Sequence, residues 1–151
     1  MTNITLGVAI MYKKILLPTD GSGYAEQEVD RVTNLISDDG EIVILSVAGK
    51  LTSSAFQSRT KVRNVNARMK KEAEEAVKRM EKMFDSSLNV TTRVETGFAA
   101  EKILEVCDEI GADLIVISAS GKSGLHRFII GSVAERVLKN SDIDVLLVHN
   151  N

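Results

Sequence analysis

The chain has 151 residues and a formal net charge of −2, and its 44% hydrophobic and 26% charged residues are typical of one soluble globular domain. The weak negative charge and the 4% aromatic content argue against a general nucleic-acid binder, which would need a basic patch and base-stacking side chains. One cysteine, Cys107, excludes an intrachain disulfide and a cysteine-cluster metal site, and it suits a reducing cytoplasm.

No apolar run approaches the roughly 18 residues that a membrane-spanning helix needs. Residues 1–11 lack the basic start and the apolar segment of a signal peptide. We therefore expect an N-terminal extension over 1–11, a single domain over 12–151, and a cytoplasmic protein.

The first half of the chain alternates apolar runs with segments of helical periodicity. An apolar run that contains the single proline predicts a buried strand, and apolar residues spaced three and four apart predict helices. The expected order is a strand over 12–19, a helix over 22–36, a turn over 37–41, a buried strand over 42–47, a mobile loop over 48–58 and a long helix over 59–84.

The second half continues the same alternation. A β-branched, alternating segment predicts a strand near a sheet edge, and Gly111 is the glycine expected just after a helix. The expected order is a strand over 89–95, a helix over 99–110, a strand over 113–118, a glycine-rich loop, a helix over 132–140 and a strand over 144–149. Such alternation indicates a parallel sheet that helices cover on both faces.

The glycine-rich loop raises the question of a phosphate site. Gly121-Lys122-Ser123 matches the end of a Walker A loop, but the first glycine of that motif would have to be Val116, which lies inside a predicted strand. The dinucleotide fingerprint also fails, because Gly21 and Gly23 after the first strand lack a third glycine at the required distance.

Two other features remain. Gly131 and Ser132 precede a helix, and Ser132 with Glu135 fits a capping box, so the free amides and the helix dipole would suit an anion. An ordinary capped helix after a flexible loop is the alternative. Asp20 follows the first strand and would face this loop if the first and fourth strands are neighbours at a topological switch point. Its alternative role is an N-cap or an Asx turn.

The segments "YKKILLPTDGSGYAEQEV", "EIVILSV" and "TGFAAEKILEVCDEIGADLIVIS" resemble the universal stress protein family. The signature loop of its nucleotide-binding branch is Gly, two residues, Gly, nine residues, then Gly-Ser or Gly-Thr. Here Gly121 is followed by nine residues and by Gly131-Ser132, whereas Ser118 replaces the first glycine of the signature. The resemblance covers residues 12–149.

This resemblance implies an α/β fold like that of adenine-nucleotide alpha hydrolases, with an open parallel sheet in the strand order 3-2-1-4-5. It also implies ATP, or another adenine nucleotide, bound with Mg²⁺ or Mn²⁺. Asp20 would meet the ribose and the metal, and the helix start with Gly131 would hold phosphates. The implied nucleotide-binding residues are Pro18, Thr19, Asp20, Ile42, Ile117, Ser118, Gly121, Gly131, Ser132 and Val133.

Three functional readings follow from these residues. The leading one is a homodimeric, ATP-binding stress-response module that acts as a switch and pairs through strand 144–149, with at most slow ATP hydrolysis and no identified catalytic residue. The alternative is a dimeric interaction protein whose pocket is vestigial, which Ser118 would favour. A phospho-accepting receiver domain is disfavoured, because the acidic cluster and the lysine that it requires are absent from the sequence.

Overall fold

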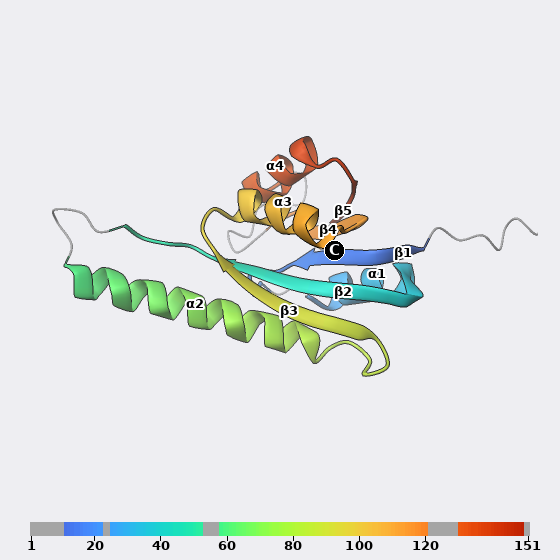
Figure 1. Cartoon of the computed structure of the whole chain (residues 1–151), viewed down its shortest axis with the longest axis horizontal. Coiled ribbons are helices and arrows are strands. Elements are labelled where there is room, and N and C mark those ends of the chain that lie inside the picture. The colour runs from blue at the N-terminus through green and yellow to red at the C-terminus, as the bar shows by residue number, and fades with distance from the viewer. Residues whose placement is uncertain (1–10, 23–24, 53–57, 121–129, 150–151) are drawn as a thin grey trace, which may run out of the picture.

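The computed structural model describes residues 11–22, 25–52, 58–120 and 130–149. Five parallel strands form one sheet in the order β3-β2-β1-β4-β5, as expected (Figure 1). The elements are β1 (Tyr12–Pro18), α1 (Ala25–Leu35), β2 (Ile36–Ala48), α2 (Arg59–Glu81), β3 (Asn89–Thr96), α3 (Ala99–Ile110), β4 (Leu114–Ser118), α4 (Ser132–Asn140) and β5 (Asp144–Val148).

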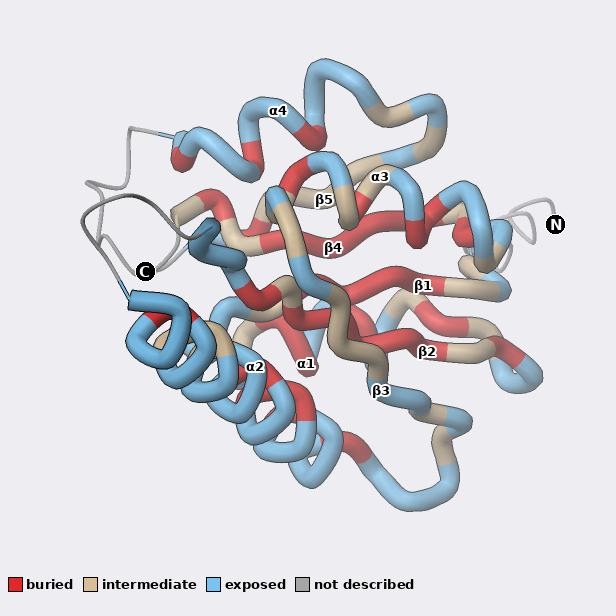
Figure 2. Tube along the Cα trace, turned by 60° about the vertical axis from the view of Figure 1, so that its left-hand side comes forward, coloured by how far each residue is buried: buried red, intermediate tan, exposed pale blue. Residues whose placement is uncertain are grey.

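Helices cover both faces of the sheet. Successive residues of β1 point to opposite faces and so belong to two different core layers. Ile15 and Leu17 pack with residues of α1 and α2 on one face, whereas Leu16 packs with residues of α3 and α4 on the other. All three side chains are fully buried, and the central strands are buried along most of their length (Figure 2). A strand with two buried faces needs a continuous apolar run, which explains why β1 is not alternating in sequence.

The position of β4 beside β1 is set at the start of both strands. The Asp113 carboxylate accepts hydrogen bonds from the amides of Lys13 and Lys14 at 3.0 and 2.9 Å, and the Asp113 amide donates to the Lys14 carbonyl at 2.9 Å. The paired residues that follow are Ile15 with Leu114 and Leu16 with Ile115. Beyond them the register of β1 continues with β2 alone, up to Pro18.

The segment expected to form a turn over 37–41 lies inside β2. Tyr12 pairs with Ile36 and Lys14 pairs with Glu41, so two steps along β1 correspond to five along β2. The intervening residues therefore bulge out of the ladder, and β2 resumes pairing at Glu41. The polar turn residues are thus accommodated as an irregularity of one long strand rather than as a separate connection.

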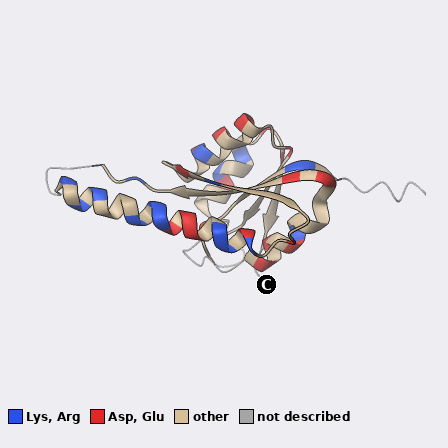
Figure 3. Cartoon of the chain, turned by 60° about the horizontal axis from the view of Figure 1, so that its bottom comes forward, with Lys and Arg blue, Asp and Glu red and all other residues tan. Residues whose placement is uncertain are grey.

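Helix α2 begins at a side-chain cap and packs by its apolar stripe. The Ser58 hydroxyl accepts a hydrogen bond from the Lys61 amide at 3.1 Å, which is the usual N-cap geometry. The helix ends three residues before the expected boundary, and Met83 is 40% exposed beyond its end. Charged residues recur along the whole helix (Figure 3), and all of them are exposed. Residues 53–57 of the expected loop lie outside the described residues.

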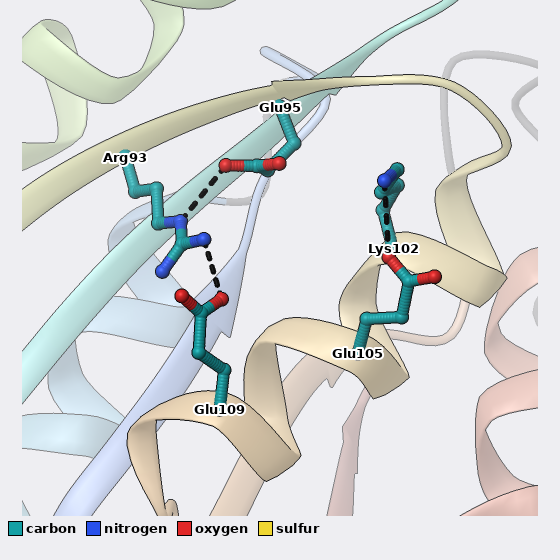
Figure 4. Close-up of polar contacts among 5 residues, drawn as sticks. All are labelled: Arg93, Glu95, Lys102, Glu105 and Glu109. Atoms are coloured by element: carbon teal, nitrogen blue, oxygen red, sulfur yellow. Dashed lines mark hydrogen bonds and ion pairs between the residues drawn. The ribbon is translucent and has the colours of Figure 1, made fainter.

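An ion-pair cluster ties α3 to the edge strand β3. The Arg93 guanidinium contacts the Glu95 carboxylate at 2.9 Å and the Glu109 carboxylate of α3 at 2.6 Å (Figure 4). On the same helix, Lys102 and Glu105 pair at 3.0 Å. The Arg93–Glu109 pair connects α3 to the edge strand β3, whereas the Lys102–Glu105 pair lies within the helix.

Helix α3 ends at Gly111 in the left-handed conformation, with φ of 69°, as the sequence predicts. No heavy atom lies within 4 Å of the position that a Cβ would take there, so strain in the backbone is the main cost of any side chain. We expect Gly111→Ala to lower the free energy of unfolding by about 1 kcal/mol in urea denaturation. Gly49→Ala is the control, because φ at Gly49 is not positive and a Cβ there would meet Met69 at an ordinary 3.5 Å. Equal losses in both variants would contradict the prediction.

Candidate functional site

A pocket of about 290 Å³ opens at the carboxyl ends of β1, β2 and β4. It lies where pairing between β1 and β4 stops. This is the topological switch point of the sheet, because the chain runs from β1 toward one edge and from β4 toward the other. Pro18 stands at this point, and it has no amide proton to donate to a further ladder bond. The pocket is therefore a product of the topology rather than of a surface loop.

The turn after β1 forms one wall of the pocket. Pro18, Thr19 and Asp20 all line it. The Thr19 amide donates to the Leu45 carbonyl at 2.8 Å, which holds the start of the turn on β2. The Asp20 carboxylate accepts a hydrogen bond from the Ser22 amide at 2.9 Å. The Asx turn weighed for Asp20 is thus present, and Asp20 is at the same time an exposed wall residue.

The first turn of α4 forms the opposite wall, through Gly131, Ser132, Val133 and Ala134. The expected capping box is wrong, because the N-cap residue is Gly131 and not Ser132. A glycine has no side chain that could bond the first amides of the helix. The Glu135 amide bonds the Gly131 carbonyl at 2.9 Å, whereas the three amides before it have no acceptor within the helix.

The end of β4 connects these two walls. Ile117 and Ser118 both line the pocket, and the Ser118 hydroxyl donates to the Ser120 carbonyl rather than projecting as a free donor. The Ala119 carbonyl accepts from the Gly131 amide at 2.7 Å, and the Ala119 amide donates to the Val148 carbonyl of β5 at 2.9 Å. The start of α4 is therefore fixed by a backbone bond to β4.

One described residue implied by the resemblance, Ile42, does not line the pocket. Ile42 is fully buried in the core and pairs with Ile15, well before the carboxyl end of β2. That end is formed by later residues, and Leu45 and Val47 line the pocket in its place. Gly121 lies outside the described residues.

Glu28 of α1 was not anticipated from the sequence. Its side chain lines the pocket while being only 4% exposed. Burial, and to a smaller extent the negative charge of Asp20, raise the pKa of the Glu28 carboxyl from 4.5 to about 8, while a hydrogen bond from the Ser118 amide acts in the opposite direction. A sequence signal existed, because Glu28 falls between Ala25 and Val32 on the apolar face of the predicted helix.

A model of the universal stress protein family matches residues 11–149. The chain belongs to this family. A universal stress protein of Methanocaldococcus jannaschii is 34% identical to it over 140 residues, which cover 91% of this chain and 82% of that protein.

Solved structures of the family share its fold. The structure of a second universal stress protein of the same archaeon is 30% identical, covers 94% of this chain and 99% of that one, and superposes with a TM-score of 0.74. A universal stress protein described in complex with cAMP is 23% identical, covers 93% of this chain and 99% of that one, and has a TM-score of 0.68.

The chemistry of this universal stress protein's pocket does not suggest a metal site built by the protein alone. Among the described residues, no three His, Cys, Asp or Glu side chains lie close enough to hold a metal ion together. Asp20 and Glu28 are the carboxyls of the described pocket wall, and Glu28 is buried. Mg²⁺ is commonly held by ligand phosphates with few protein groups. A Mg²⁺ ion at the described wall would therefore need oxygen ligands beyond these two carboxyls.

None of the described helices is both long and apolar enough to cross a membrane.

The buried carboxyl makes stability depend on pH. Between pH 4.5 and about 8 the folded state holds a proton on Glu28 that the unfolded state has released, so stability falls as the pH rises through this window and then levels off. We expect Glu28→Gln to stabilise the protein by on the order of 4 kcal/mol at pH 9 and to leave stability at pH 4 nearly unchanged. Urea unfolding at both pH values measures this. The exposed neighbour variant Glu26→Gln should show no such difference; a pH-independent effect of Glu28→Gln would contradict the assignment.

Proposed function

We propose that this universal stress protein binds an adenine nucleotide, with ATP as the leading candidate, and acts as a homodimeric, nucleotide-dependent switch in a cytoplasmic stress response. The single observation that carries the proposal is the pocket between Asp20 and the start of α4, at the point where β1 and β4 separate. One wall offers a carboxylate and the other offers helix amides, which are complementary to the two ends of a nucleotide.

Each part of a nucleotide has a matching part of the wall. The Asp20 carboxylate suits ribose hydroxyls, and the amides of the first turn of α4 suit a phosphate, because they lie at the positive end of the helix dipole. The apolar side chains of Leu45, Val47 and Ile103 give the adenine ring a dry surface. The volume of about 290 Å³ lies at the small end of ligand pockets, so the nucleoside would fill it and further phosphates would extend past α4.

The family gives this proposal a precedent. Three solved universal stress proteins are described with cAMP, with dAMP and with AMP. They are 23%, 18% and 17% identical to this chain, so they support the capacity of the fold to hold such ligands and leave the ligand of this chain to experiment.

The proposed dimer would form through β5, which ends the sheet. Three apolar residues of β5, Val145, Leu146 and Leu147, are only partly buried within one chain. An apolar edge strand needs a cover, and twofold pairing with a second copy would supply it. The backbone bonds of Ala119 to Gly131 and to Val148 connect the pocket with this strand, so a ligand at α4 could change the pairing.

The role of Asp20 can be tested by calorimetric titration of ATP with Mg²⁺. We expect Asp20→Ala to raise Kd about tenfold to a hundredfold, because a hydrogen bond to a charged group contributes about 1.5–3 kcal/mol. Asp38→Ala is the control, since Asp38 is exposed in the β2 bulge opposite the start of β1, away from the pocket. Denaturing freshly purified protein and analysing released adenine nucleotide is an independent check. Unchanged affinity in Asp20→Ala would refute the placement of the ribose.

The vestigial-pocket alternative rests on Ser118, and Ser118→Gly separates the two readings. The Ser118 hydroxyl donates to the Ser120 carbonyl, so we expect Ser118→Gly to change Kd by less than about threefold, or about 0.6 kcal/mol. If instead the wild-type protein shows no binding at millimolar ATP and Ser118→Gly restores it, the serine closes the pocket and the interaction-protein reading is correct.

A further inference from the structure

Among the described residues of the pocket, the buried carboxyl of Glu28 is a feature that an anionic ligand does not explain. Glu28 lies on the face of α1 that also carries the buried residues Val29 and Val32, yet its side chain reaches the pocket wall. Its carboxyl accepts a hydrogen bond from the Ser118 amide, and the negative charge of Asp20 also acts on it. No buried side-chain oxygen or nitrogen is left without a partner among the described residues, so the carboxyl is built into the fold.

The charges that the described residues place around Glu28 are unfavourable for a phosphate in the same pocket. The turn after β1 contributes the negative Asp20, and β4 contributes only a neutral amide at Ser118. On α2, the Arg79 guanidinium lies against Gly21 in the turn after β1, where a Cβ would meet its Nη2 atom at 3.2 Å. A phosphate entering this pocket would be the third negative group if Glu28 were ionised. In surroundings of low dielectric, such repulsion is much stronger than in water.

We propose that Glu28 is a specificity-determining residue that admits a phosphate-bearing ligand only while its carboxyl carries a proton. The inference rests on the proposed binding of an adenine nucleotide to this pocket. Neutral Glu28 leaves Asp20 as the single charged side chain among the described residues of the wall and leaves the phosphate facing the amides of α4. Ionised Glu28 opposes the phosphate without any change in the shape of the pocket.

Linkage fixes the direction of the effect. Burial already favours the protonated form, with a pKa of about 8, so the free protein carries the proton at neutral pH and loses it in alkaline solution. A phosphate nearby favours the proton further, and binding therefore takes up a proton when the pH exceeds 8. The Kd should rise about tenfold for each pH unit above that point, for one linked proton.

The test compares AMP with adenosine between pH 7 and 9.5, by calorimetry with EDTA present. A phosphate monoester has a second pKa of about 6, so its charge is constant over this range. We expect AMP binding to weaken above pH 8 with uptake of one proton, counted from heats in two buffers of different ionisation enthalpy. Adenosine has no phosphate, and its affinity should vary far less. Circular dichroism at each pH establishes that the protein is folded.

Two variants complete the test. Glu28→Gln keeps the shape and stays neutral, so its Kd for AMP should remain at the wild-type value of pH 7 throughout the range. Glu26→Gln, on the exposed side of the same helix, should retain the wild-type pH profile. Parallel weakening of AMP and adenosine, or an unchanged profile in Glu28→Gln, would overturn the inference while leaving nucleotide binding intact. Absence of AMP and ATP binding at pH 7 in the wild-type protein would overturn the proposed function, and this inference with it.

Discussion

The site of this protein depends on how β4 is held beside β1, and Asp113 provides that constraint. Its carboxylate accepts both the Lys13 and the Lys14 amides, and its own amide donates to Lys14. Backbone amides inside a sheet must find acceptors, so this arrangement satisfies the start of β1 and fixes the register of β4 at once. Only two residue pairs follow before β1 and β4 part. The pocket occupies the space where they separate, and a shift of one residue would turn every side chain of β4 to the other face.

This origin explains the electrostatic character of the pocket. At the point of separation the chain supplies a carboxylate from the turn after β1, amides from the start of α4, and a second carboxyl from α1 beneath them. In the proposed complex the amides would attract the phosphate, the two carboxyls would oppose it, and protonation of one carboxyl would reduce that repulsion. Because Glu28 is buried and Asp20 is exposed, the proton belongs on Glu28. The proposed ligand would therefore meet helix amides at one end of the pocket and, at the other, a wall whose charge depends on the protonation of Glu28.

The fold could be predicted from the sequence because both of its signals are local and strong. Buried parallel strands are continuous apolar runs and amphipathic helices show their spacing, so every helix and strand was anticipated, with bounds within three residues except at the start of β2, which lies six residues earlier than expected. The turn over 37–41 was mistaken for a connection, since polar residues in a bulge and in a loop look alike in sequence. The capping box was wrong by one residue, because Gly131 and Ser132 are both acceptable N-caps and only the backbone decides between them.

The wall of the site was less predictable, because it depends on register. Ile42 and Leu45 are both buried residues of the same apolar run. The pairing of Pro18 with Leu45, and the hydrogen bond from the Thr19 amide to the Leu45 carbonyl, show which of them lies at the carboxyl end of β1. Glu28 was missed for a different reason. A carboxyl on the apolar face of a helix is expected to point away or to find a partner, and its partners, the Ser118 amide and the field of Asp20, come from segments distant in sequence.

The proposals on ligand and dimer share one residue, and this makes them dependent on each other. Ala119 uses its carbonyl for the Gly131 amide and its amide for the Val148 carbonyl, so a single peptide segment carries both bonds. Because these are backbone bonds, ligand-induced movement of the first turn of α4 must either break the 2.7 Å bond or pull β4 and β5 with it. Movement of β4 and β5 with the helix costs less free energy than breaking this bond when no other acceptor lies near the Gly131 amide. A ligand at α4 would then act on β5 directly, and not through the helices that cover the sheet.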